Sequence, residues 1–287
     1  MTQAIQVPPS LSKSKPLRGC ALCREDLLQL YRLLQTLLDE AGDLEISDYQ
    51  AREGQTEVQL KETKNLVKNM FKVFVRIETE KGAITSQASE DVFTRPDMPV
   101  NVSRIEFDGG FIFRDRVKQN PRNQVYVLLD FRNIISPTIS VQSAQATPND
   151  SQFLVSGEDA NWVRAAHSKL EEYFENKIRK GMWIHSAGTY DLFLMTIGII
   201  FVAWVLNFFV PHIDNLFVGL SKIYSYASYI FIFLAALRFF MFMFDYARVM
   251  WPIMELKGAN PVAVGHRWIW AMILVTVIGG IIKDLLF

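Results

Sequence analysis

The residues whose spacing first points to chemistry are the chain's two cysteines, in Cys20-Ala-Leu-Cys23. A C-x-x-C pair lets two thiolates hold one zinc ion or form a redox couple. A zinc site needs two more ligands, and the histidines at positions 167, 185, 212 and 266 show no paired spacing. The pair also lies in a proline-bearing lead-in to a predicted helix and does not follow a strand. We therefore assign it no metal or redox site.

Four carboxylates lie on or beside predicted strands and form a second candidate set: Glu106, Asp108, Asp115 and Asp130. Convergent carboxylates bind magnesium in nucleases and phosphodiesterases. Alternating charges are also the ordinary pattern of a strand with one solvated face. The sequence contains no glycine loop for phosphates, no dinucleotide fingerprint, and no zinc-protease or nucleophile-elbow motif. We predict no catalytic, cofactor-binding or metal-binding residues and lean against an enzyme.

Arg238 is the charge in the most unusual surroundings, because it interrupts an otherwise apolar stretch. Inside a bilayer such a charge needs a partner, water or access to the interface. One interpretation is an intramembrane latch to Asp245, seven positions later and on about the same helix face. In a second interpretation Arg238 extends its side chain to the polar boundary, and in a third it lines an ion path. The sequence leaves all three open.

Three apolar segments would place these residues in a membrane. Segment 192–210 contains no charged residue and segment 223–244 contains only Arg238. Both approach the roughly 30 Å that a spanning helix must cover. The third segment, 268–285, has a shorter uncharged core and could instead be a re-entrant or interfacial helix. We predict a helical membrane domain over 181–287 with two or three spans.

Basic residues near the ends of these segments predict their orientation. They precede the first span or lie between the second and third: Lys177, Arg179, Lys180, Arg248, Lys257 and Arg267. The short connection between the first two spans offers only Lys222. We expect a multi-pass protein of the cell inner (plasma) membrane with a cytoplasmic N-terminus.

The first 180 residues are expected to form an α+β domain ahead of the membrane domain. Residues 1–22 are predicted to be a flexible N-terminus, and 23–180 a cytoplasmic domain with an amphipathic helix, a mainly antiparallel sheet and a C-terminal helix. Strands are predicted around 71–77, 105–107, 111–113, 125–131, 139 and 153–155. A hairpin is predicted at Gly109-Gly110, because two glycines separate alternating hydrophobic residues.

The predicted helix near residues 24–41 carries a stripe of leucines spaced for one face: Leu27, Leu30, Leu34 and Leu37. Packing onto its own domain is the favoured use, and a self-association face is the alternative. Thirty Lys and Arg balance thirty Asp and Glu over the chain, so no nucleic-acid partner is expected.

This architecture favours a membrane protein whose cytoplasmic domain binds a protein partner or signal and couples it to a small, homo-oligomeric bundle in the lipid bilayer. Such a protein would be an effector, a sensor or a scaffold. No cofactor is expected. The alternative is a membrane-tethered enzyme with an unrecognised active site.

Overall fold

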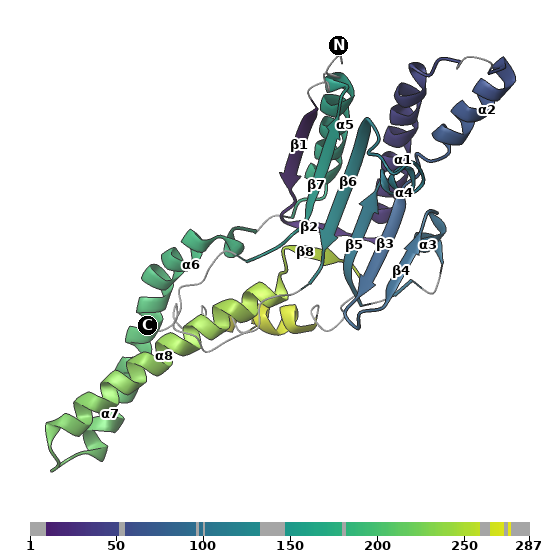
Figure 1. Cartoon of the computed structure of the whole chain (residues 1–287). Helices are drawn as coiled ribbons and strands as arrows, with labels where there is room; N and C mark the ends of the chain where they lie inside the picture. Colours follow the sequence, from purple (N-terminus) through teal and green to yellow (C-terminus); the bar gives the residue numbers. More distant parts are fainter. Residues whose placement is uncertain are drawn as a thin grey trace. The chain divides into compact units, whose positions relative to one another are not determined.

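A computed structural model describes residues 10–51, 55–95, 98–99, 101–132, 147–179, 182–258, 265–272 and 275–276 (Figure 1). The chain divides into two compact units, which we name the sheet unit and the hairpin unit. The sheet unit comprises Met1–Arg132, Asn149–Lys180 and Met254–Pro261, and the hairpin unit comprises Asn133–Pro148, Gly181–Ile253 and Val262–Phe287. The sheet unit thus takes a segment from far beyond residue 180.

Over the described residues, the sheet unit is built on six antiparallel strands in the order β1-β7-β6-β5-β3-β4 (Figure 1). These are β1 (Leu11–Pro16), β3 (Phe74–Thr79), β4 (Ile84–Gln87), β5 (Val102–Asp108), β6 (Asn123–Asp130) and β7 (Gln152–Gly157). Val125, Val127 and Leu129 of β6 are buried, as period-two alternation predicts for a strand with one covered face. The α+β class and the antiparallel sheet are confirmed.

Two helices, α1 (Arg24–Ser47) and α5 (Ala160–Glu175), cover one face of this sheet. Helix α1 contacts β6, and α5 contacts β7 and β1. Helix α5 begins at Asp159, whose carboxylate accepts hydrogen bonds from the backbone of Asn161 and Trp162, a common N-terminal cap. The Trp162 indole then donates to the Leu37 carbonyl at 3.3 Å. This bond joins the two helices over the hydrophobic core.

The leucine stripe of α1 lies in that core. Leu27, Leu30, Leu34 and Leu37 are at most 1% exposed. Four side chains buried in their own domain offer no surface to a second copy. The alternative prediction of a self-association face was therefore wrong. Packing onto the domain, the favoured interpretation, is what the structure shows.

Two strands occupy part of the predicted flexible N-terminus, so that prediction was wrong for residues 11–22. Strand β1 pairs with β7 at the edge of the sheet. A separate strand, β2 (Cys20–Leu22), pairs in parallel with β8 (Met254–Leu256). Residues 1–9 lie outside the described residues, as does the predicted strand around residue 139.

The predicted hairpin at Gly109-Gly110 was also wrong, because a helix, α4 (Phe111–Val117), follows the two glycines. A Cβ on Gly109 would lie 2.5 Å from the Leu38 Cδ2 atom of α1, so this glycine permits a close approach. The Asp108 carboxylate accepts from the Gly110 N–H at 2.9 Å and from the Arg114 guanidinium at 2.5 Å. These bonds turn the chain into α4. The remaining short helices are α2 (Glu57–Lys68) and α3 (Asp91–Thr94).

The hairpin unit contains two long apolar helices. The first joins α6 (Ala187–Phe193), a π-helical turn (Leu194–Gly198) and α7 (Ile199–Leu216), and the second is α8 (Lys222–Met250). By length and composition, Gly188–Leu216 and Lys222–Met250 could each cross a membrane. They contact one another where Gly198 faces Phe240, whose Cε1 atom would lie 3.0 Å from an added Cβ. Of the third apolar segment, 265–272 is helical and most of the rest lies outside the described residues.

Candidate functional site

Three distant stretches of the sheet unit meet around β2, in a small sheet that we name the clasp (residues 19–22, 177–179 and 254–257). On one side Cys20, Ala21 and Leu22 pair with Met254, Glu255 and Leu256, and the Lys257 N–H donates to the Leu22 carbonyl at 2.7 Å. On the other side Cys20 forms an antiparallel bridge with Ile178. The clasp therefore holds both the chain that leads toward the first long helix and the chain that leaves the second.

Ion pairs close the clasp on both sides of β2. Lys177 pairs with Asp26 at 2.5 Å, and Arg179 pairs with Glu255. Asp26 also accepts a hydrogen bond from the Cys23 N–H at 2.7 Å, at the start of α1. Burial acts to raise the pKa of the Asp26 carboxyl, but the Lys177 ammonium and Cys23 lower it on balance. The carboxylate is therefore charged at neutral pH and fixes the pre-helix chain to α1.

The two cysteines belong to this clasp as structural residues. Cys20 is 1% exposed within β2, and burial raises the pKa of its thiol to about 11. The pKa of Cys23, which precedes the first residue of α1, is also raised, first by burial and then by Asp26. Thiolate is the form that binds metals and attacks disulfides. Both cysteines are free thiols, so the geometry gives no support to zinc or redox chemistry at this pair.

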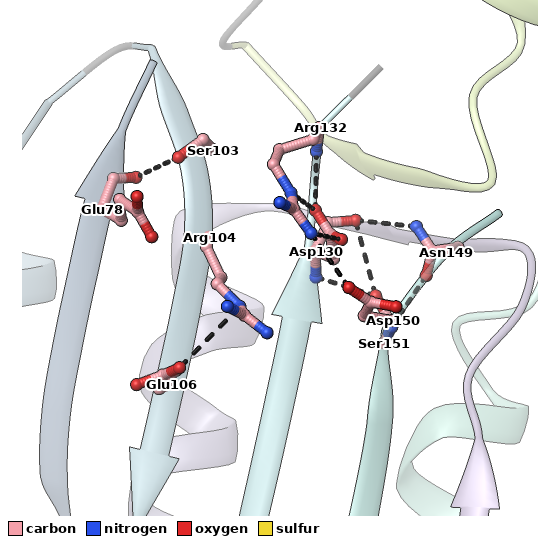
Figure 2. Close-up of polar contacts among 9 residues, drawn as sticks. All are labelled: Glu78, Ser103, Arg104, Glu106, Asp130, Arg132, Asn149, Asp150 and Ser151. Carbon is pink, nitrogen blue, oxygen red and sulfur yellow. Dashed lines mark hydrogen bonds and ion pairs between the residues drawn. The ribbon is translucent and has the colours of Figure 1, made fainter. Parts of the chain in front are cut away.

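A second polar cluster closes the ends of β6 and β7 (Figure 2). Asp130 is 0% exposed, and its carboxylate accepts from the Arg132 side chain at 2.8 and 2.6 Å. Arg132 also pairs with Asp150 at 3.0 Å. Asn149 donates to the Asp130 carbonyl at 2.9 Å, and the Ser151 hydroxyl accepts from the Asp130 N–H at 2.8 Å. Because these groups satisfy one another, the cluster fixes the two chain ends at which β6 leaves and β7 begins.

On the face of the sheet away from α1 and α5, charges alternate in sign across neighbouring strands. The register places Arg76 opposite Glu106, and places Arg104 between Glu78 and Asp130. The Arg104 Nε atom lies 3.8 Å from the Glu106 carboxylate, and the Ser103 hydroxyl donates to the Glu78 carbonyl at 3.0 Å (Figure 2). Opposite charges on facing strands stabilise antiparallel pairing.

The four carboxylates considered for magnesium each have a basic neighbour. These pairs are Glu106 with Arg104, Asp108 with Arg114, Asp115 with Lys118, and Asp130 with Arg132. Across the described part of the chain, no group of three or more potential metal-ligating side chains occurs. The geometry therefore favours the structural interpretation of these residues.

In the hairpin unit, His185 and Arg248 bring together three chain segments, which we name the hairpin base (residues 147, 184–186 and 245–251). The His185 Nε2 atom lies 2.5 Å from the Trp251 carbonyl, and its Nδ1 atom lies 2.9 Å from the Thr147 hydroxyl. A carbonyl only accepts, so Nε2 carries the proton and Nδ1 accepts. Burial lowers the pKa of the His185 imidazole.

Arg248 completes the hairpin base and is 3% exposed. Its Nε atom donates to the Ile184 carbonyl at 2.8 Å, and its guanidinium lies over the Phe244 ring at 4.8 Å. Asp245, one turn earlier, approaches it at 4.0 Å. A buried guanidinium is stable only where acceptors surround it, so Arg248 holds the segment before the first long helix against the end of α8.

Sequence reasoning singled out Arg238 and missed Arg248, which it counted only as a flanking charge. Arg238 is partly exposed on α8, and the predicted latch between Arg238 and Asp245 stays a prediction. The i, i+3 spacing of Asp245 and Arg248 was the available signal. The position of His185 between residues 147 and 251 could not be read from the sequence.

The described start of the third apolar segment also packs at the Met250 end of α8. Arg267 donates to the Met250 carbonyl at 2.8 Å. The Tyr246 ring stacks on Trp270, with centroids 6.0 Å apart, and its hydroxyl bonds to the His266 ring. The third segment therefore begins at the end of α8 that is closest in sequence to the clasp.

In comparisons with known proteins, no family model, no curated protein and no solved structure matches this chain. Its function is therefore inferred from the geometry of the clasp, the hairpin base and the long helices.

Proposed function

We propose that the chain is an integral membrane protein in which a cytoplasmic α+β unit binds a protein partner or signal and couples it to a small, homo-oligomeric helical bundle. The two long helices support insertion. Only 11% of the most apolar 18 residues of each helix are buried within the chain. A core helix of a water-soluble domain would bury its apolar side chains, whereas a bilayer covers such side chains with lipid.

The clasp supports a hairpin that enters and leaves the bilayer on one side. Arg179 in the clasp precedes Gly188, the start of the first long helix, by nine residues. Met250, at the end of α8, precedes Met254 of β8 by four residues. The four-residue connection reaches at most about 14 Å. The nine-residue connection contains the helical turn Met182–His185, which shortens it, so neither crosses a roughly 30 Å hydrocarbon layer in addition to the helices. Both polar ends of the hairpin therefore belong on the side of the sheet unit.

Basic residues favour the cytoplasm for that side. The segment before the first helix, the last turn of α8 and the segment after α8 together carry six of them, and the connection between the two helices offers only Lys222, at the start of α8. On this basis we propose a multi-pass protein of the inner (plasma) membrane with a cytoplasmic N-terminus. The third segment starts on the same side and, if it spans, would place the C-terminus outside.

The coupling is supported by three places where the chain passes from one unit to the other. At each of them, hydrogen bonds, ion pairs or strand pairing hold the chain both before and after the passage. At 148–149, Thr147 bonds to His185 and Asp150 pairs with Arg132. At 180–181, Arg179 lies in the clasp and the Ile184 carbonyl accepts from Arg248. At 253–254, the Trp251 carbonyl accepts from His185 and Met254 pairs with Cys20. A conformational change in the sheet unit would therefore be transmitted to the hairpin base through connections of only a few residues.

Labelling of introduced cysteines in intact cells tests the topology. Ser221→Cys places a thiol in the turn between the long helices, and Lys81→Cys places one in the exposed β3–β4 turn. The parent chain, which contains the buried Cys20 and the partly exposed Cys23, is the matched control, and its labelling is subtracted from that of each variant. A membrane-impermeant maleimide should label Ser221→Cys directly and Lys81→Cys only after permeabilisation. The chain should also stay with the membranes in a carbonate wash.

Release of the chain by carbonate would contradict insertion. Equal labelling of both positions in intact cells would contradict the hairpin topology, even if the chain remained membrane-bound.

A further inference from the structure

Asn207 is a polar residue on the lipid-facing surface of α7 that the features described above leave unexplained. Its side chain is exposed, and no hydrogen bond joins it to any other described residue. Two other polar side chains of the first long helix do have partners: the Thr196 hydroxyl donates to the Leu192 carbonyl at 2.7 Å, and Asp214 accepts from the Tyr229 hydroxyl. Asn207 differs from these two residues in having no hydrogen-bond partner among the described residues.

Its depth follows from the proposed insertion, on which this inference rests. Twenty residues separate Asp191 from His212, and at about 1.5 Å per residue they span roughly 30 Å, the thickness of the hydrocarbon layer. Asn207 precedes His212 by five residues and so lies about 7 Å inside that layer. A short carboxamide side chain cannot reach the interface from there.

An unpaired carboxamide at that depth is costly, because lipid tails offer no hydrogen bond. The residues one turn away on its face are Ala203, Trp204, Val210 and Pro211, none of which has an acceptor in its side chain. A partner must therefore come from another helix at the same depth.

A second copy of this chain supplies such a partner by symmetry. Two copies with the same orientation in the bilayer, related by a twofold axis along its normal, place both Asn207 residues at one depth. A carboxamide is self-complementary, since its N–H groups can donate to the oxygen of an identical group. We infer that α7 forms the contact between two copies of this chain and that the paired Asn207 side chains hydrogen-bond across it.

The test measures self-association of the full chain in lipid vesicles. Fluorescence energy transfer between donor- and acceptor-tagged chains is followed as lipid dilutes the protein. Asn207→Leu should weaken association roughly 3- to 30-fold, the range that interhelical hydrogen bonds contribute in membranes. Asn207→Gln keeps the carboxamide and should retain most of the association. Thr196→Val is the matched control and should change nothing, because its hydroxyl is satisfied within its own helix.

Three outcomes would overturn the contact. The first is association of Asn207→Leu at the parental strength, the second is equal weakening by Thr196→Val, and the third is a monomeric parent at every dilution. If the chain stays in the vesicles through a carbonate wash, these outcomes refute the contact alone. Loss of the chain in that wash would refute the membrane proposal and the contact with it.

Discussion

Reversing the charge of Arg179 should open the clasp. Its guanidinium pairs with Glu255, and the two side chains are 30% and 15% exposed. Fully exposed pairs contribute about 0.2–1 kcal/mol, and breaking a buried pair costs about 3–5 kcal/mol. For a partly buried pair screened by solvent we expect Arg179→Glu to cost about 1–2 kcal/mol. Opening of the clasp should then become roughly 5- to 30-fold more frequent.

Hydrogen exchange of the full chain in detergent micelles can measure this opening. The Lys257 N–H, which donates to the Leu22 carbonyl, reports on β8, and a peptide covering residues 125–129 reports on the six-stranded sheet. We expect faster exchange in residues 254–258 and unchanged exchange in β6, because local opening of one strand leaves the rest of the core protected.

The swapped variant, Arg179→Glu with Glu255→Arg, separates the pair from other effects of each substitution. It should restore much of the lost protection. Unchanged exchange at residues 254–258 in the single variant would refute the assignment of the clasp. Equal acceleration in β6 would show that the substitution destabilises the whole unit and not the clasp.

Three further outcomes follow from buried groups. Leu34→Ala should lower the free energy of unfolding by about 2–5 kcal/mol in a denaturant titration, because it opens a cavity in the core. Asp130→Asn should lower it by about 1–3 kcal/mol, because it weakens the bonds from Arg132. Since the folded pKa of Asp130 is lowered, its contribution in the parent should begin to fall below pH about 4 and be lost as pH falls through the lowered folded pKa, and it should be absent in the variant. Since burial lowers the folded pKa of His185, the hairpin base should weaken as pH falls below about 6.5. Exchange protection of the Thr147 N–H, which donates to the His185 carbonyl at 3.3 Å, should therefore fall with pH in the parent but not in His185→Gln.

The parts of the fold that the sequence predicts are those with strong hydrophobic periodicity. The alternation of Val125, Val127 and Leu129 predicts β6, and the leucines of α1 predict a helix with a wide buried face. Two long apolar stretches, the second interrupted only by Arg238, likewise predict the long helices. For β6 and α1 a single local pattern is sufficient, because burial of one face dominates the energetics of the element.

Elements that depend on distant partners could not be predicted in this way. Edge strand β1 is polar, and its Lys15 pairs with Glu171 of α5; edge strands are often charged, which removes the hydrophobic signal. Strand β8 is only three residues long. The glycine at position 109 fits a hairpin pattern, but in the structure it allows the close approach of the Leu38 side chain from α1, a distant contact that no local pattern shows. Similarly, the role of Arg248 depends on a carbonyl that lies 64 positions earlier.

The clasp also imposes an order on biosynthesis. Arg179, the last residue on one side of β2, leaves the ribosome 78 residues before Lys257, which completes the other side. At about 5–20 residues per second, one edge of β2 stays open for roughly 4 to 16 s. During that interval the two long helices are synthesised. The α+β unit therefore completes its folding only after the hairpin has been made, so a chain truncated within the hairpin leaves an unpaired strand edge that chaperones and proteases can recognise.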